Sequence, residues 1–216
     1  MATALAAIHP AFARWNRKAH TARGANAPFC AMPPDIDELT KTIESRRHIA
    51  DVSGEVMASL GFPFAAWNGI DGPAGVGFRM NVGAYATTHS FPNQIEFDFM
   101  RLEEANQDLL SPKVLKAVLL TLIDAWEPNW ALLTDSRYFH ALVERGPLPL
   151  FNAGWMTYLA APHARKFRAP PKAIVEPMAG GGILISATRD RFTIDDPDHV
   201  LAADAIQDAL AQLHMD

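Results

Sequence analysis

The chain has 216 residues, of which 49% are hydrophobic and 20% are charged, the balance of an ordinary globular protein. Its net charge of −5 and its pI of about 5.9 argue against nonspecific nucleic-acid binding through phosphate contacts. A single cysteine, Cys30, cannot form an internal disulfide, which argues against a secreted disulfide scaffold.

The N-terminal segment has the pattern of an amphipathic helix and not of a targeting sequence. Leu5, Ile8, Phe12 and Trp15 are spaced for one helical face, which predicts a first helix ending near residues 15–18. A signal peptide carries its basic residues before the apolar stretch, whereas here they follow it. No apolar run approaches the roughly 18 to 20 residues of a membrane span. We therefore expect a cytoplasmic protein that does not bind membranes, with an organelle transit peptide as the alternative.

A second helix is predicted after two consecutive prolines. Asp35 is a suitable N-cap, and acidic residues follow it in the first turn. The expected buried stripe of this helix consists of Ile36, Leu39, Ile43 and, beyond it, Ile49. Gly61 is expected to end the next apolar stretch in the manner of a helix C-cap.

Three strands are predicted next, at residues 62–68, 76–84 and 94–99. In the third strand, apolar and polar residues alternate strictly, so one face should pack against the core and the other should face solvent. The apolar set is Ile95, Phe97 and Phe99, and the polar set is Gln94, Glu96 and Asp98. Joints rich in glycine, aspartate and proline between these strands predict an antiparallel meander.

A long helix begins at Ser111 as N-cap and Pro112 as first helical residue. Its apolar face runs to Trp126, which we expect to lie in the core. Pro128 cannot continue a helix, so a new strand is expected to begin at Trp130. Of the two tryptophans, Trp130 is expected to be the more exposed.

The C-terminal part repeats the pattern of strands followed by a helix. Strands are predicted at residues 154–160, 172–176 and 182–188, with a glycine-rich hairpin turn before the last one. Asp196 and Pro197 begin the final helix. Its expected core face consists of Leu201, Ala205, Ile206, Ala209, Leu210 and Leu213. The fold class is therefore α+β, with antiparallel sheet meanders and helices packed on them.

We expect one domain, residues 1–216, with two similar halves near residues 35–126 and 127–216. None of the eight histidines has the spacing of a metal site, and there is no CxxC motif. Ser59 lacks the glycine pattern of a nucleophile elbow, and Cys30 is more typical of a small buried residue than of a catalytic one. We therefore expect no catalytic residue, no metal and no cofactor.

Several segments occur in an order that resembles the immunity protein 52 family of bacterial polymorphic toxin systems. They are HPAFARWNRKA, LGFPFAAWNG, AWEPNWALLTD, GWMTYLA and GGGILISATRDRFTIDDPDHVLAADAIQDAL. The resemblance covers residues 8–213 and implies an α+β fold without enzymatic activity. It also implies that the protein binds and neutralises a cognate toxin, usually a nuclease with a restriction-endonuclease-like fold. Several such toxins are delivered by type VI secretion.

A DNA-binding groove is basic, so acidic residues on this chain are the candidates for binding such a toxin and blocking its active site or DNA groove. They are Glu96, Asp98, Glu103, Glu104, Asp195, Asp196, Asp198, Asp204 and Asp208. The chain itself is expected to bind no nucleic acid. One alternative is an enzyme or small-ligand-binding protein with a cleft between the halves, using exposed Trp130, Tyr158 and Glu96. Another is a structural adaptor.

Overall fold

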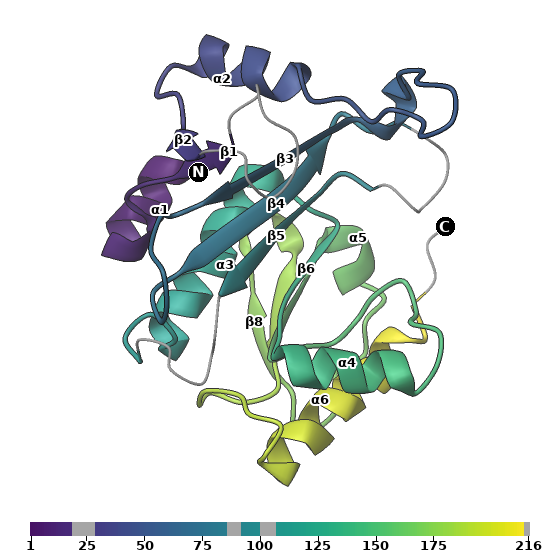
Figure 1. Cartoon of the computed structure of the whole chain (residues 1–216). Coiled ribbons are helices and arrows are strands. Elements are labelled where there is room, and N and C mark those ends of the chain that lie inside the picture. Colours follow the sequence, from purple (N-terminus) through teal and green to yellow (C-terminus); the bar gives the residue numbers. More distant parts are fainter. Residues whose placement is uncertain (19–28, 86–91, 100–106, 214–216) are drawn as a thin grey trace. The chain divides into compact units, whose positions relative to one another are not determined.

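The computed structural model describes residues 1–18, 29–85, 92–99 and 107–213, which form two compact units (Figure 1). The N-terminal unit contains Ala2–Leu109, and the C-terminal unit contains Leu110–Asp216 together with Met1. Across the described residues there are six α-helices and two antiparallel sheets, which confirms the predicted α+β class. The division falls at residues 109 and 110, before the long helix, so that helix belongs to the C-terminal unit. The expectation that the whole chain is one domain stays a prediction.

In the N-terminal unit, five described strands form a sheet in the order β2-β1-β3-β4-β5. The three predicted strands are confirmed within two residues at each end. Their bounds are Phe62–Trp67 for β3, Val76–Val82 for β4 and Gln94–Phe99 for β5. These strands form the expected antiparallel meander. Two further strands, β1 (Asn16–Lys18) and β2 (Phe29–Ala31), extend the sheet beyond β3 and were not predicted.

One face of this sheet carries an aromatic core. Trp15 lies 4.9 Å from Phe78 and 5.8 Å from Phe97, measured between ring centroids, and Phe12 lies 6.4 Å from Phe99. Such edge-to-face pairs stabilise a core beyond the area that they bury. The N-terminal segment of the chain therefore packs on this face and covers it.

The predicted first helix is shorter than expected. Helix α1 covers Ala2–Ile8, and a separate 3-10 turn, η1, covers Pro10–Phe12. Pro10 has no N–H with which to continue the α-helical ladder, so the chain turns before Phe12. The expected apolar residues are still used, since Leu5, Phe12 and Trp15 are buried.

Helix α2 (Ile36–Glu44) begins as predicted, because the Asp35 side chain accepts hydrogen bonds from the backbone N–H groups of Asp37 and Glu38, both at 3.0 Å. Its predicted buried stripe is only partly found, because Leu39 and Ile43 are half-buried while Ile36 is 70% exposed. Ile49, beyond the helix, is also exposed, and the residue that α2 buries fully is Thr42. The N-terminal end of the apolar stripe therefore lies in solvent.

Gly61 follows the 3-10 helix η2 (Ala58–Leu60) and does end an apolar helical turn, as expected, although that turn is not α-helical. Its φ of +80° and ψ of −156° lie in a region that is essentially restricted to glycine. A Cβ at this position would collide with the carbonyl oxygen of Val82 and lie 2.7 Å from the backbone nitrogen of Ala84. The sequence position therefore requires glycine for two independent reasons.

In the C-terminal unit, four described strands form a sheet in the order β6-β7-β9-β8. They are Trp130–Leu133 (β6), Met156–Leu159 (β7), Ile174–Pro177 (β8) and Ile183–Ser186 (β9), each inside or within one residue of its predicted range. The glycine-rich turn is also confirmed, because Gly180 and Gly181 have positive φ between β8 and β9. All four residues of β7 are buried, which indicates a strand covered on both faces.

The described helices of this unit are α3 (Pro112–Trp126), α4 (Ser136–Glu144), α5 (Ala161–Ala164) and α6 (Pro197–Leu210). The predicted caps are confirmed, since Ser111 caps α3 and Asp196 caps α6. Two burial predictions are wrong. Trp126 is half-buried, because α3 ends there in the left-handed residue Glu127, and Leu201 is 62% exposed while Ala202 and Ala203 fill the core side of α6. Trp130 is also half-buried, so the expected difference in exposure between the two tryptophans is not seen.

Candidate partner-binding surfaces

The polar face of the N-terminal sheet brings two of the candidate acids together on β5. Arg79 on β4 lies directly opposite Glu96 in the antiparallel register, and its guanidinium is hydrogen-bonded to the Glu96 carboxylate. A second guanidinium nitrogen lies 3.6 Å from a carboxylate oxygen of Asp98. The hydrogen bond to Glu96 and the charges of both acids raise the pKa of Arg79, so it remains a cation. These three exposed residues carry a net charge of about −1.

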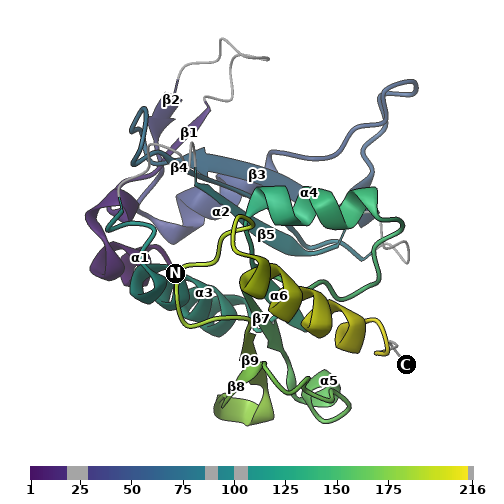
Figure 2. The ribbon, with the colours of Figure 1, turned by 90° about the horizontal axis from the view of Figure 1, so that it is seen from below.

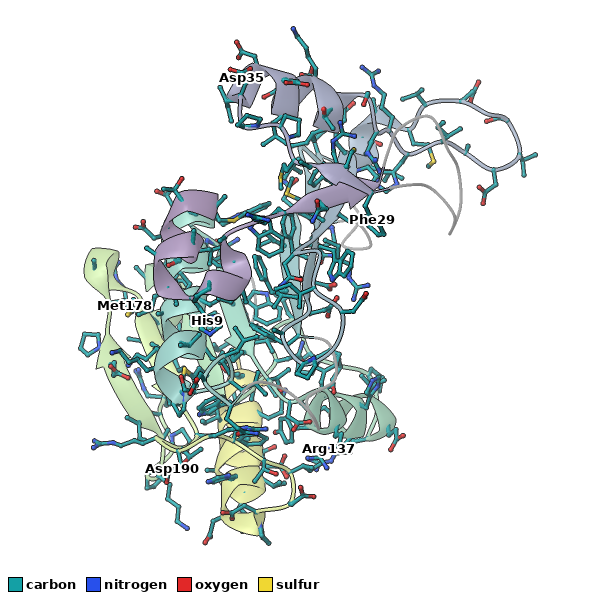
Figure 3. All side chains as sticks on the ribbon, turned by 60° about the vertical axis from the view of Figure 1, so that its left-hand side comes forward. His9, Phe29, Asp35, Arg137, Met178 and Asp190 are labelled. Carbon is teal, nitrogen blue, oxygen red and sulfur yellow. The ribbon has the colours of Figure 1, made fainter. Side chains whose placement is uncertain are left out.

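The same face continues into an aromatic pair. The side chains of paired residues in neighbouring strands point to the same side, so Trp67 and Ala65 on β3 share the face of Arg79. The ring of Phe29 on β2 lies 5.1 Å from the Trp67 ring between centroids, and half of Phe29 is exposed. The face thus combines partly exposed aromatic surface with a charged cluster, and Figure 3 labels Phe29 on it.

The candidate acids of the C-terminal unit lie in α6 or just before it, and they differ in how many intramolecular contacts they make. Asp195 accepts hydrogen bonds from Arg137 at 3.2 Å and from the Thr193 hydroxyl at 3.1 Å. These bonds, that of Arg137 first, lower the pKa of the Asp195 carboxyl. Asp196 uses its carboxylate to cap α6 by accepting from the N–H of Asp198 at 2.9 Å.

Asp204 is the most strongly engaged of these acids. One of its oxygens accepts from the Tyr138 hydroxyl at 2.9 Å and from Arg145 at 2.8 Å. Tyr138 is fully buried on α4, and burial, followed by the hydrogen bond to Asp204, raises its pKa. Figure 2 shows α4 and α6 side by side, and this contact joins them. Asp204 therefore serves the packing of the unit.

The remaining acids of α6 are more available to a partner. Asp198 is largely exposed, with the Lys172 ammonium 3.9 Å from its carboxylate. Asp208 lies one turn beyond Asp204 and is exposed. Glu103 and Glu104 lie outside the described residues.

Sequence reasoning missed the arginines that neutralise these acids. Arg79, Arg137 and Arg145 each pair with a candidate acid in another element, so no local spacing reveals them. Only the pairing of Arg79 with Glu96 was accessible in principle, because the register of the predicted meander places them opposite each other. These arginines make the electrostatic potential around the candidate acids less negative than the sequence suggested.

Within the part of the chain that the structure describes, no group of three or more His, Cys, Asp or Glu residues is placed to hold a metal ion. In the same residues, no helix has both the length and the apolar character needed to cross a membrane.

A family model for immunity protein 52 matches residues 1–215. The chain belongs to the immunity protein 52 family. No curated protein matches the sequence significantly. Family membership identifies the chain as an immunity protein, and it directs attention to surfaces that bind another protein instead of to a catalytic pocket.

Proposed function

We propose that this immunity protein binds a cognate secreted nuclease toxin, with a restriction-endonuclease-like fold, and blocks its active site or DNA groove. The observation that carries the proposal is the match to the immunity protein 52 family over residues 1–215. We further propose that the protein acts in the cytoplasm, as inhibition of a DNA-cleaving toxin requires, and that the toxin is one delivered by type VI secretion.

Electrostatics supports a basic partner surface. Nucleases bind DNA with basic grooves, and carboxylates on an inhibitor can occupy the positions of phosphates. On the described surface, Glu96, Asp98, Asp198 and Asp208 are exposed and are the acids that we assign to such contacts. Asp196 and Asp204 are only half-exposed and are hydrogen-bonded within the unit, so we assign them a secondary role. Asp195 is exposed but, like Glu96, is hydrogen-bonded to an arginine.

The burial of Tyr158 argues against the alternative of a small-ligand site. That alternative requires exposed Trp130, Tyr158 and Glu96, but Tyr158 is buried in β7. Its ring therefore cannot serve as an exposed platform, and inhibition of a protein toxin remains the better supported function.

Rescue of toxicity tests the proposal. The protein encoded by the neighbouring gene is expressed in a bacterial host with and without this chain, and we expect growth to be restored and DNA degradation to stop only when both are present. A catalytically inactive version of that protein should bind the purified chain. An adaptor without inhibitory function would leave the host unprotected, and that result would overturn the proposal.

The acids on β5 are tested by replacing carboxylates with carboxamides of the same shape, Glu96→Gln and Asp98→Asn. Charge reversal is less suitable, because a lysine at position 96 would face Arg79 across the strands and lower stability. We expect the dissociation constant for the toxin to rise about tenfold, as for the loss of roughly 1.4 kcal/mol at an interface. Asp71→Asn on an exposed loop is the matched control. Adding Glu103→Gln and Glu104→Gln completes the set, and unchanged affinity in the fourfold variant would exclude this surface.

A further inference from the structure

A hairpin in the N-terminal unit, residues 48–57, exposes apolar side chains that the fold does not use. Every residue from 51 to 58 is exposed. The exposed apolar members are Ile49, Val52, Val56 and Met57, and Val52 at the tip is 101% exposed. Asp51, Ser53 and Gly54 provide the residues that turns favour, so Val52 between them is exposed without being needed for the turn.

The hairpin is held in one conformation despite this exposure. Ile49 and Val56 form an antiparallel bridge, and the N–H of Met57 donates to the carbonyl of His48 at 2.8 Å. The N–H of Ala50 donates to the carbonyl of Glu55 at 2.9 Å. A segment that is already ordered loses less conformational entropy on binding, so its apolar groups can act efficiently as anchors.

The base of the hairpin is fixed to the sheet. The His48 ring hydrogen-bonds to the Asn81 side chain at 3.1 Å, and the Asn81 amide donates to the carbonyl of Leu60 at 2.8 Å. The guanidinium groups of Arg46 and Arg47 lie over the rings of Phe64 and Phe62, at 6.0 and 5.9 Å from the centroids. These contacts hold the base, while the tip at Val52 extends into solvent.

Helix α2, which precedes the hairpin, has one exposed apolar residue, Ile36, at its first position. Figure 3 labels Asp35 at the start of this helix, and the chain passes from α2 into the projecting hairpin. Residues 35–57 contain three basic residues and six acids, a net charge of −3 in a short segment. All six acids are exposed: Asp35, Asp37, Glu38, Glu44, Asp51 and Glu55. The segment thus combines exposed apolar side chains with an excess of negative charge.

We infer that α2 and the hairpin, residues 35–57, form a docking surface for a protein with a basic surface around an apolar pocket. This inference rests on the proposed function, in which that protein is the nuclease toxin. Charge complementarity selects this occupant, because the net negative charge of the segment complements the basic rim of a DNA-binding groove. The apolar tip then fills a pocket within it, as anchor residues do at the centre of protein interfaces.

The test compares two pairs of exposed apolar residues. The docking variant is Val52→Ser with Val56→Ser, and the control variant is Val143→Ser with Val175→Ser, both exposed in the C-terminal unit and outside α6. Binding to the inactive form of the toxin encoded by the neighbouring gene is measured by calorimetry, and the thermal midpoint of each variant is measured alongside. We expect the docking variant to raise the dissociation constant about tenfold or more, and the control variant to leave it within about twofold.

The outcomes separate the inference from the function on which it rests. If the wild-type chain neither binds nor protects, the proposed function fails and the docking surface fails with it. If the wild type binds and protects while the docking variant binds equally well, only the docking surface is wrong. If the double variant is poorly folded, Val52→Ser by itself decides, because a fully exposed side chain contributes no buried area to the fold, and unchanged binding of that variant overturns the inference.

Discussion

At the scale of single residues, two glycines of the N-terminal unit share a positive φ but differ in what surrounds them. Gly61 has a glycine-specific φ and ψ, and a Cβ on it would collide with the backbone of Val82 and Ala84. Gly72 also has a positive φ, but a Cβ there would meet no atom within 4 Å. Alanine at each of these two positions therefore allows the free-energy cost of a steric collision to be distinguished from that of an unfavourable φ.

We predict that Gly61→Ala lowers the free energy of unfolding by about 3 kcal/mol or more, through backbone strain and collision together. Gly72→Ala should cost about 1 kcal/mol, because only the backbone conformation is unfavourable. Urea unfolding of the purified variants measures both. Equal losses in the two variants would show that the contact with Val82 and Ala84 does not matter.

Sequence patterns anticipated features that depend on near neighbours along the chain. The caps at Asp35, Ser111 and Asp196 were predicted because each is a local arrangement of side chain and backbone. Likewise, the alternation in β5 shows directly which side chains are half-buried and which are exposed, since the period of a strand is two.

Other features depend on partners distant in the sequence, and these were missed. Strands β1 and β2 have three residues each, too few for a periodic signal, and are defined by their pairing. The orientation of α2 and α6 depends on which small residues fit against the rest of the unit, so Thr42 and Ala203 are buried while Ile36 and Leu201 are not. For the candidate site, sequence identified the acids but not the arginines opposite them.

At the scale of elements, the contact between α4 and α6 is the clearest case in which an ionisable group stabilises packing. The Tyr138 hydroxyl is buried and donates to Asp204, so the neutral tyrosine is the form that the folded state favours. Its pKa is raised on folding, and its contribution to stability is therefore complete below the pKa of the unfolded chain, about 10. That contribution is lost as pH rises above this value.

We predict that Tyr138→Phe lowers the free energy of unfolding by about 1 to 2 kcal/mol at pH 7, since one buried hydrogen bond is lost. Between pH 10 and 11 the wild type should lose stability more steeply than the variant, so the difference between them should shrink. Guanidinium unfolding at several pH values measures this. Parallel pH profiles would contradict the assignment, because the other tyrosines are common to both proteins.

At the scale of the whole molecule, negative charge is distributed over the entire chain. Residues 1–109 contain nine basic and twelve acidic residues, and residues 110–216 contain ten and twelve, so the two parts contribute −3 and −2. Long-range attraction of a basic partner therefore does not depend on one cluster of acids.

If the partner is the proposed nuclease toxin, we predict that the association rate falls about tenfold between 50 and 500 mM salt, because screening shortens the range of attraction. The dissociation rate should change much less, since it depends mainly on contacts within the interface. Stopped-flow binding at a series of salt concentrations measures both rates. An association rate independent of salt would show that net charge does not steer the encounter.

The division of the hairpin into an anchored base and an exposed tip has an evolutionary consequence. Positions such as Val52 contribute no buried area, so they can mutate without a cost in folding, whereas His48 and Asn81 at the base cannot. If the tip binds the toxin as inferred above, a lineage whose toxin diverges could follow it by substitutions at the tip while the base of the hairpin stays unchanged. Related chains should then vary most at the tip and least at the base, and exchange of the tip between two of them should exchange the toxin that each neutralises.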